Sequence, residues 1–139
     1  MSKPAASRSN RTSCRVLVVE DNAEVAWLIA DVLAIDGCEA TLVSTAKAAR
    51  SQIDRHRWDL LVVDVTVDAE SGEAVVQYAA DNQPRLREAT LVTTADPFTP
   101  GRREQLADLG RVVLYKPFNI DALRGLAAGL VRHMDRAAA

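Results

Sequence analysis

Two patterns of hydrophobic positions alternate along the chain. Short apolar runs rich in β-branched residues occupy residues 16–19, 40–43, 60–63, 90–93 and 112–115. Runs of this length that are apolar on both faces predict strands buried on both sides of a parallel sheet. Between the runs, apolar residues recur every three to four positions, which is typical of amphipathic helices.

The helical pattern is clearest after the first run and near the C-terminus. Its apolar stripes are Val25, Leu28, Ile29, Val32 and Leu33 in the first helix and Leu123, Leu126, Ala127, Leu130, Val131 and Met134 in the last. Weaker patterns predict helices over about 45–56, 72–81 and 101–109. Residues suited to helix ends agree with these boundaries; they are Asn119, Thr99-Pro100, Gly37 and Gly110.

Five repeats of strand and helix predict parallel strands joined by right-handed crossovers, with helices on both faces of the sheet. For a chain of 139 residues the expected form is α/β, a doubly wound five-stranded parallel sheet of the flavodoxin-like (βα)5 type with strand order 2-1-3-4-5. We expect one domain over residues 14–136. Residues 1–13 are expected to be a disordered basic tail and residues 137–139 a short C-terminal tail.

Composition excludes several classes of function. The hydrophobic fraction of 48% suffices for a core, and 17 basic against 19 acidic residues give a net charge of −2. We therefore expect no nucleic-acid partner. No apolar run is long enough for a membrane span or a signal peptide, so we expect no membrane association and a cytoplasmic location. Cys14 and Cys38 precede adjacent strands and are either small packed residues or a redox pair.

The polar residues that end the predicted strands carry the candidate chemistry. Glu20 and Asp21 follow the first strand, Asp64 the third, Thr94 the fourth and Lys116 the fifth. Ligands of open α/β sheets bind beyond the carboxyl ends of the strands, so these side chains are expected on one edge. Acids grouped in this way need a cation, and a ligand set made only of oxygens favours Mg²⁺.

Phosphoryl transfer fits this set of residues. A carboxylate beside a metal can act as the nucleophile that accepts a phosphoryl group, and Lys116 and Thr94 supply a positive charge and a hydroxyl donor for its oxygens. Each residue alone could be an ordinary loop, cap or turn residue. Their common position at strand ends carries the hypothesis, and Asp59, at the start of the third strand, is expected on the opposite edge.

The order and spacing of these residues resemble those of response-regulator receiver domains, over about residues 14–136. The matching pieces are Glu20-Asp21 after the first strand, Asp64, Gly72 eight residues later, Thr94-Ala95 thirty residues after Asp64, and Lys116-Pro117-Phe118. Together these pieces are far more specific than any one of them.

The resemblance implies a role for each residue. Asp64 is the phosphoacceptor, and Glu20, Asp21 and Asp64 hold Mg²⁺ with the backbone carbonyl of Thr66. Lys116 pairs with Asp64 and then with the phosphoryl group, and its bond to Pro117 is cis. Thr94 is the switch residue that hydrogen-bonds the phosphoryl group.

The resemblance also implies a function in a two-component phosphorelay. The phosphoryl group comes from a phosphohistidine on a sensor histidine kinase or a histidine phosphotransfer protein. Because only 23 residues follow Lys116, we expect a single-domain response regulator that signals through conformational change to an unknown downstream protein. It is expected to be a monomer or a phosphorylation-linked dimer. It is not expected to be an enzyme with a diffusible substrate.

Three departures from the family pattern stand out. Val113 occupies the position of the usual switch aromatic, and Tyr115, two residues later on the same strand face, is either a substitute or a packing residue. Asp68 replaces the usual proline after the phosphoacceptor. The segment Asp96–Gly101 is unusually rich in turn residues.

Other classes of function remain open at the level of sequence. A degenerate receiver, acting as a phosphorylation-independent interaction module, is slightly favoured by the missing aromatic and proline, whereas the intact acids, Thr94 and Lys116 count against it. A small phosphohydrolase commonly needs a second acid two residues after the nucleophile, where Thr66 stands. A flavodoxin-like electron carrier conflicts with Glu20-Asp21, which would repel the flavin phosphate.

The remaining aromatic and histidine residues have simpler interpretations. Trp27 lies off the apolar stripe of its helix, so we expect it to be exposed and to be a contact for a kinase. Trp58 is expected to pack in the core. His56 and His133 are expected at the solvated surface.

Overall fold

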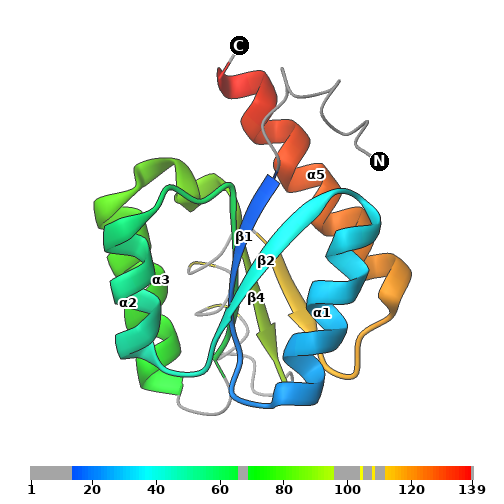
Figure 1. Ribbon diagram of the computed structural model, residues 1–139, viewed down its shortest axis with the longest axis horizontal. Helices are drawn as coiled ribbons and strands as arrows, with labels where there is room; N and C mark the ends of the chain where they lie inside the picture. Colours follow the sequence, from blue (N-terminus) through cyan, green and yellow to red (C-terminus); the bar gives the residue numbers. More distant parts are fainter. Residues whose placement is uncertain (1–13, 66–68, 96–103, 105–107, 109–111, 139) are drawn as a thin grey trace, which may run out of the picture.

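Figure 1 shows the computed structural model of the chain, in which residues 14–65, 69–95, 104, 108 and 112–138 are described. Five strands form one sheet in the order β2-β1-β3-β4-β5, and every neighbouring pair is parallel. The strands are β1 (Cys14–Val19), β2 (Cys38–Val43), β3 (Leu60–Asp64), β4 (Thr90–Thr94) and β5 (Val112–Tyr115). The predicted flavodoxin-like sheet and its strand order are confirmed.

Helices cover both faces of the sheet. In Figure 1, α1 (Ala23–Ile35) and α5 (Ile120–Ala138) lie on one face, and α2 (Ala46–Arg55) and α3 (Ala69–Asn82) lie on the other. A 3₁₀ helix, η2 (Pro84–Glu88), precedes β4. Of the helix predicted over 101–109, only Glu104 and Asp108 are described, and both are helical and exposed. Its expected end residues, Thr99-Pro100 and Gly110, lie outside the described residues. No helix in the described part of the chain is long and apolar enough to cross a membrane.

Helix ends follow the local chemistry of the sequence. The side chain of Asn119 caps α5 as predicted, because its Oδ1 accepts hydrogen bonds from the backbone N–H groups of Asp121 (2.7 Å) and Ala122 (3.1 Å). Asn22 and Thr45 cap α1 and α2 in the same way. Gly37 follows α1 with a φ of +86°, the left-handed conformation that the prediction assigned to it.

Three details of the predicted pattern are wrong. Leu28 was placed on the buried stripe of α1, but it is 41% exposed, because the helix packs through a face centred on Ile29 and Leu33. Strands β2 and β5 were predicted to be buried on both sides, yet most of their residues are only half-buried, because each lies at an edge of the sheet. The 3₁₀ helix η2 has too few residues for periodicity to reveal it.

The amino ends of the strands form an edge of their own. Asp59 lies there as predicted, and its Oδ2 accepts a hydrogen bond of 2.8 Å from the backbone N–H of Arg15. Trp58 is buried, which confirms its packing role, and its Nε1 donates to the carbonyl of Gln52 (3.0 Å).

The two cysteines lie at this same edge. Cys14 and Cys38 are free thiols and are direct partners in the register between β1 and β2. A hydrogen bond from Cys14 lowers the pKa of the Cys38 thiol, although burial opposes that shift. The expected proximity of the two cysteines is confirmed, and Cys38 is buried while Cys14 is half-buried.

Gly72 allows α3 to approach the end of β3 closely. A Cβ atom at this position would lie 2.9 Å from the Cα of Val65 and 3.1 Å from the carbonyl oxygen of Asp64. Both contacts are with backbone, which cannot move aside cheaply. The start of α3 is therefore held against the strand that ends in Asp64.

We predict that Gly72→Ala destabilises the protein by about 1–3 kcal/mol, because the steric clash outweighs the better helix propensity of alanine. Gly125→Ala in α5 is the matched control, since no atom lies within 4 Å of its added Cβ. This control is expected to stabilise by about 0.5–1 kcal/mol. Urea denaturation monitored by circular dichroism measures both, and equal effects of the two substitutions would contradict the packing assigned to Gly72.

Candidate functional site

Four strand ends bring the predicted residues to one edge of the sheet. Glu20 and Asp21 follow β1, Asp64 ends β3, Thr94 ends β4, and Lys116 follows β5. Backbone hydrogen bonds extend the sheet to these positions: the N–H of Glu20 donates to Val43 O (3.0 Å), and that of Lys116 donates to Thr94 O (2.7 Å). The parallel register thereby fixes the site before any side chain interacts.

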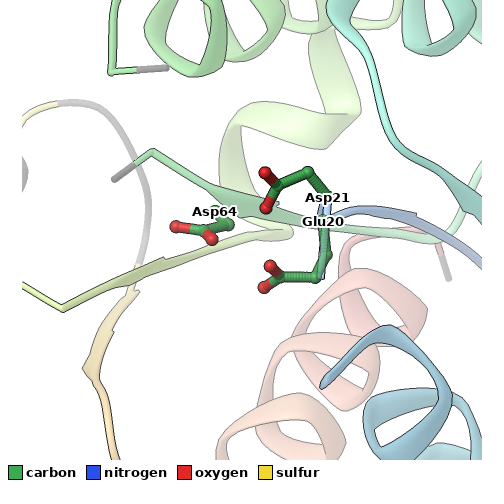
Figure 2. A group of neighbouring side chains, drawn as sticks. All are labelled: Glu20, Asp21 and Asp64. Carbon is green, nitrogen blue, oxygen red and sulfur yellow. The ribbon is translucent and has the colours of Figure 1, made fainter. Parts of the chain in front are cut away.

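Three carboxylates lie side by side at this edge. Figure 2 shows Glu20, Asp21 and Asp64 pointing toward the same side, with ligand oxygens within 4.8 Å of one another. Glu20 and Asp64 are buried, whereas Asp21 is exposed. The grouping that the sequence predicted is therefore present, with one carboxylate open to solvent.

Lys116 joins two of these carboxylates. Its Nζ donates to Glu20 Oε1 at 2.8 Å and to Asp64 Oδ2 at 2.9 Å, and each acid side chain is only 1% exposed. The expected pairing of Lys116 with Asp64 is confirmed, and the equally short contact with Glu20 was not anticipated from the sequence. The peptide bond between Lys116 and Pro117 is cis, as expected.

Lys116 is the cation in direct contact with the two buried acids, Glu20 and Asp64. Burial raises the pKa of the Glu20 carboxyl, and the hydrogen bonds from Lys116 and from the backbone of Asn22 only partly oppose this rise. Burial acts to lower the pKa of Lys116, but its hydrogen bonds to Glu20 and Asp64 prevail and the pKa is raised. Lys116 therefore stays protonated beside Glu20 and Asp64.

The carboxylates fit a hard divalent cation. Glu20, Asp21 and Asp64 offer only oxygen ligands, which suit a hard dication such as Mg²⁺. Oxygens bound to one Mg²⁺ at about 2.1 Å lie at most about 4.2 Å apart. The observed spread of up to 4.8 Å requires only a small movement or a bridging water. Of the expected ligands, the Thr66 carbonyl lies outside the described residues.

A hollow of about 490 Å³ adjoins the three acids. Its other walls come from the start of α2 and from α3, so the almost fully buried Asp64 lies in the wall of a hollow. The residues that line it are Val19, Glu20, Asp21, Ser44, Thr45, Ala46, Lys47, Arg50, Asp64, Gly72 and Val75. Lys47 and Arg50 were not singled out in the sequence, because the helical pattern around them gives no sign that they face the acids.

The residues expected to transmit a signal are only partly described. Thr94 is 1% exposed at the end of β4, beside the site. Val113 and Tyr115 are half-buried on β5, and Tyr115 has an interaction partner of its own. Asp68 and the segment 96–101 lie outside the described residues.

Comparisons with known proteins bear on the family and the fold. Residues 16–128 match the model of the response regulator receiver domain family. No match was found among curated proteins. Among solved structures, the receiver domain of Francisella response regulator 1452 shares 23% identity with a TM-score of 0.74, covering 86% of this chain and 98% of that one.

Two further structures agree with this likeness. A CheY-like receiver domain protein from Methanospirillum hungatei JF-1 shares 17% identity with a TM-score of 0.79, covering 91% of this chain and 99% of its own. The receiver domain of sensor histidine kinase PA1611 from Pseudomonas aeruginosa PAO1 shares 23% identity with a TM-score of 0.75. The match covers 87% of this chain and 99% of that one, and that structure holds a magnesium ion in its active site cleft. At identities this low, the similarity to these solved structures shows a shared fold and nothing further.

We predict that Lys116→Met destabilises the metal-free protein by about 3 kcal/mol at pH 8 and by less at pH 5. Loss of the Lys116 hydrogen bond raises the pKa of Glu20 further, so Glu20 takes up a proton as the pH falls and its unfavourable buried charge disappears. Urea denaturation in EDTA at both pH values measures the difference. Arg124→Met, which breaks the exposed pair with Asp36, is the control and should change little.

Proposed function

This chain belongs to the family of response regulator receiver domains, and we propose that it receives a phosphoryl group from a phosphohistidine onto Asp64. The donor is a sensor histidine kinase or a histidine phosphotransfer protein. The observation that carries this proposal is the arrangement around Asp64. Its carboxylate is bound by Lys116, lies beside Glu20 and Asp21, and lines a hollow open to solvent.

The proposed reaction is a single displacement at phosphorus. One oxygen of Asp64 forms a bond to phosphorus while the bond from phosphorus to the histidine nitrogen breaks, and the imidazole leaves with the electron pair. The ammonium of Lys116, already 2.9 Å from Asp64, is placed to hydrogen-bond the transferred group. Positioning and charge neutralisation supply most of what such a transfer requires.

We assign Glu20, Asp21 and Asp64 as the residues that would hold Mg²⁺, with the Thr66 carbonyl as a proposed fourth ligand. When bound, the ion neutralises negative charge on the phosphoryl oxygens. The close grouping of the three carboxyl groups, which offer only oxygen ligands, supports this assignment. So does the magnesium ion in the active site cleft of the PA1611 receiver domain.

The proposed output begins at Thr94. Its hydroxyl belongs to a buried side chain at the end of β4, one strand away from Asp64, where it could turn toward a phosphoryl group. We propose that this movement alters the surface around β5 and α5, which a downstream protein or a second copy of the chain then binds. Val113 offers no aromatic ring to couple with Thr94, so any such coupling falls to Tyr115.

The exposed face of α1 is the proposed docking surface for the phosphodonor protein. Trp27 is 66% exposed, as predicted, and Leu28 and Ile35 on the same helix are also exposed. Large apolar side chains are seldom left in solvent without a binding role when they lie together. The helix starts directly after Glu20 and Asp21, so a protein bound to α1 lies close to the site.

We predict that incubation with acetyl phosphate and Mg²⁺ adds a single phosphoryl group to the protein, seen by intact-mass spectrometry. Asp64→Asn should abolish the adduct, because an amide oxygen is a poor nucleophile. Asp59→Asn is the matched control, since Asp59 lies at the start of the same strand and on the opposite edge, and it should keep full labelling.

Beryllofluoride with Mg²⁺ provides the second readout of the same prediction. Saturable binding that needs Asp64 is expected if the acids and Lys116 form a working site. If neither acetyl phosphate nor beryllofluoride modifies the wild-type protein, phosphotransfer is excluded and the chain is a degenerate receiver that acts as an interaction module.

We predict that Trp27→Ala slows phosphotransfer from a histidine kinase by about tenfold or more, as loss of a central interface aromatic does. The rate of labelling by acetyl phosphate should stay unchanged, because α1 does not contribute to the chemistry. The kinase to use is the one in a purified panel that labels the wild-type chain fastest. An equal loss with both donors would show that Trp27 acts on folding or on the site, not on docking.

A further inference from the structure

We propose that a second hollow, at the end of the sheet opposite Asp64, binds a small phosphate anion. This rear hollow has a volume of about 330 Å³ and is lined by residues 53–58 and 82–85. It lies between the C-terminal end of α2 and the segment that joins α3 to η2, beside the amino end of β3. It is separate from the phosphoacceptor site and does not depend on the function proposed there.

The rear hollow concentrates positive charge on a chain whose net charge is negative. Arg55, Arg57 and Arg85 line it, all three are exposed, and none of them forms an ion pair with another described residue. Asp54 is the one acid in its lining, and its carboxylate accepts a hydrogen bond of 2.6 Å from the Tyr78 hydroxyl. Three arginines thus line one hollow whose lining contains a single acidic residue.

Helix capping does not account for these arginines. Basic residues at a helix C-terminus often bind the last free carbonyl groups. In the part of the chain that the structure describes, none of the three arginines hydrogen-bonds to those carbonyls. Two of the carbonyls already have other donors, because Trp58 Nε1 donates to Gln52 O (3.0 Å) and Gln83 Nε2 donates to Ile53 O (2.9 Å). Gln83 Nε2 also donates to His56 O (2.7 Å), just beyond the helix. The guanidinium groups therefore remain available to a ligand.

The walls of the rear hollow are fixed before a ligand arrives. Gln83 bridges them, because its Nε2 donates to carbonyls on the α2 side while its Oε1 accepts from the backbone N–H of Trp58 (3.0 Å). The Trp58 side chain is only 3% exposed and forms the floor. A preformed site loses little conformational entropy when it binds, so modest contacts suffice for measurable affinity.

The lining selects phosphate chemistry over a nucleobase. Planar guanidinium groups match the oxygens of phosphate in pairs, and a diphosphate can span more than one of them. A volume of 330 Å³ lies at the small end of ligand sites. The Trp58 ring offers no free face for stacking, because the Arg15 guanidinium lies 5.0 Å from its centroid and His56 contacts it edge-on at 6.0 Å. Inorganic pyrophosphate is the corresponding probe.

The test is a titration of the full-length ¹⁵N-labelled protein with pyrophosphate, in EDTA and at constant ionic strength. The chain has two tryptophans, and their indole N–H signals report on separate places. The Trp58 signal should shift and saturate, because Trp58 is one of the lining residues, while the signal of exposed Trp27 on α1 stays unchanged. Inorganic phosphate should bind more weakly, and a nucleoside diphosphate no more tightly than pyrophosphate.

Charge variants distinguish a specific binding site from nonspecific electrostatic attraction. Arg57→Ala and Arg85→Ala should each raise the dissociation constant about fivefold or more. Arg87→Ala is the matched control, since Arg87 is an exposed arginine on the same 3₁₀ helix that does not line the hollow, and it should leave binding unchanged. Asp54→Asn removes the opposing charge and should tighten binding. The proposal is overturned if the Trp58 signal does not saturate, if Arg87→Ala weakens binding as much as Arg85→Ala, or if the nucleotide binds far more tightly than pyrophosphate.

Discussion

The ammonium group of Lys116 lies between Glu20 and Asp64, at 2.8 and 2.9 Å, and both acids are almost fully buried. Two buried carboxylates this close repel each other unless a cation lies between them. Lys116 supplies that cation from β5, a strand separated from β1 in the sheet by β3 and β4. The contact therefore ties the edge strand to the centre of the sheet and fixes the position of the Asp64 carboxylate.

The parallel sheet gives the two ends of the molecule opposite characters. All the carboxyl ends meet at one edge, where the three acids and the larger hollow lie. All the amino ends meet at the other, where Arg55, Arg57 and Arg85 surround the rear hollow. In this chain one end of the sheet therefore carries the proposed metal and phosphoryl site and the other end the proposed anion site, with the packed core between them.

Much of this arrangement could be predicted from the sequence. The five apolar runs predicted the five strands to within two residues at each end, and strand topology then placed Glu20, Asp64 and Lys116 together without knowledge of any contact. The wrong predictions concerned burial, which depends on the neighbouring elements in the fold. Leu28 fits the periodicity of α1, but packing of Ala26, Ile29 and Leu33 against the rest of the fold turns it outward. The half-exposed strands β2 and β5 look central in sequence, because apolar content does not tell an edge strand from an inner one.

The sequence by itself determined which residues end the strands, because the alternation of apolar runs and helical stripes sets where each strand stops. It also determined the caps at Asn119 and Gly37, which depend on a few local backbone groups. Only the tertiary structure decided that Lys116 binds Glu20 as well as Asp64, that Gly72 must be small to pass Val65, and that Gln83 bridges the rear hollow. The contacts of Lys116 and Gln83 join residues far apart in the chain, and that of Gly72 depends on how α3 packs against the end of β3. Their distances are fixed by the packing of helices and strands, which no local pattern encodes.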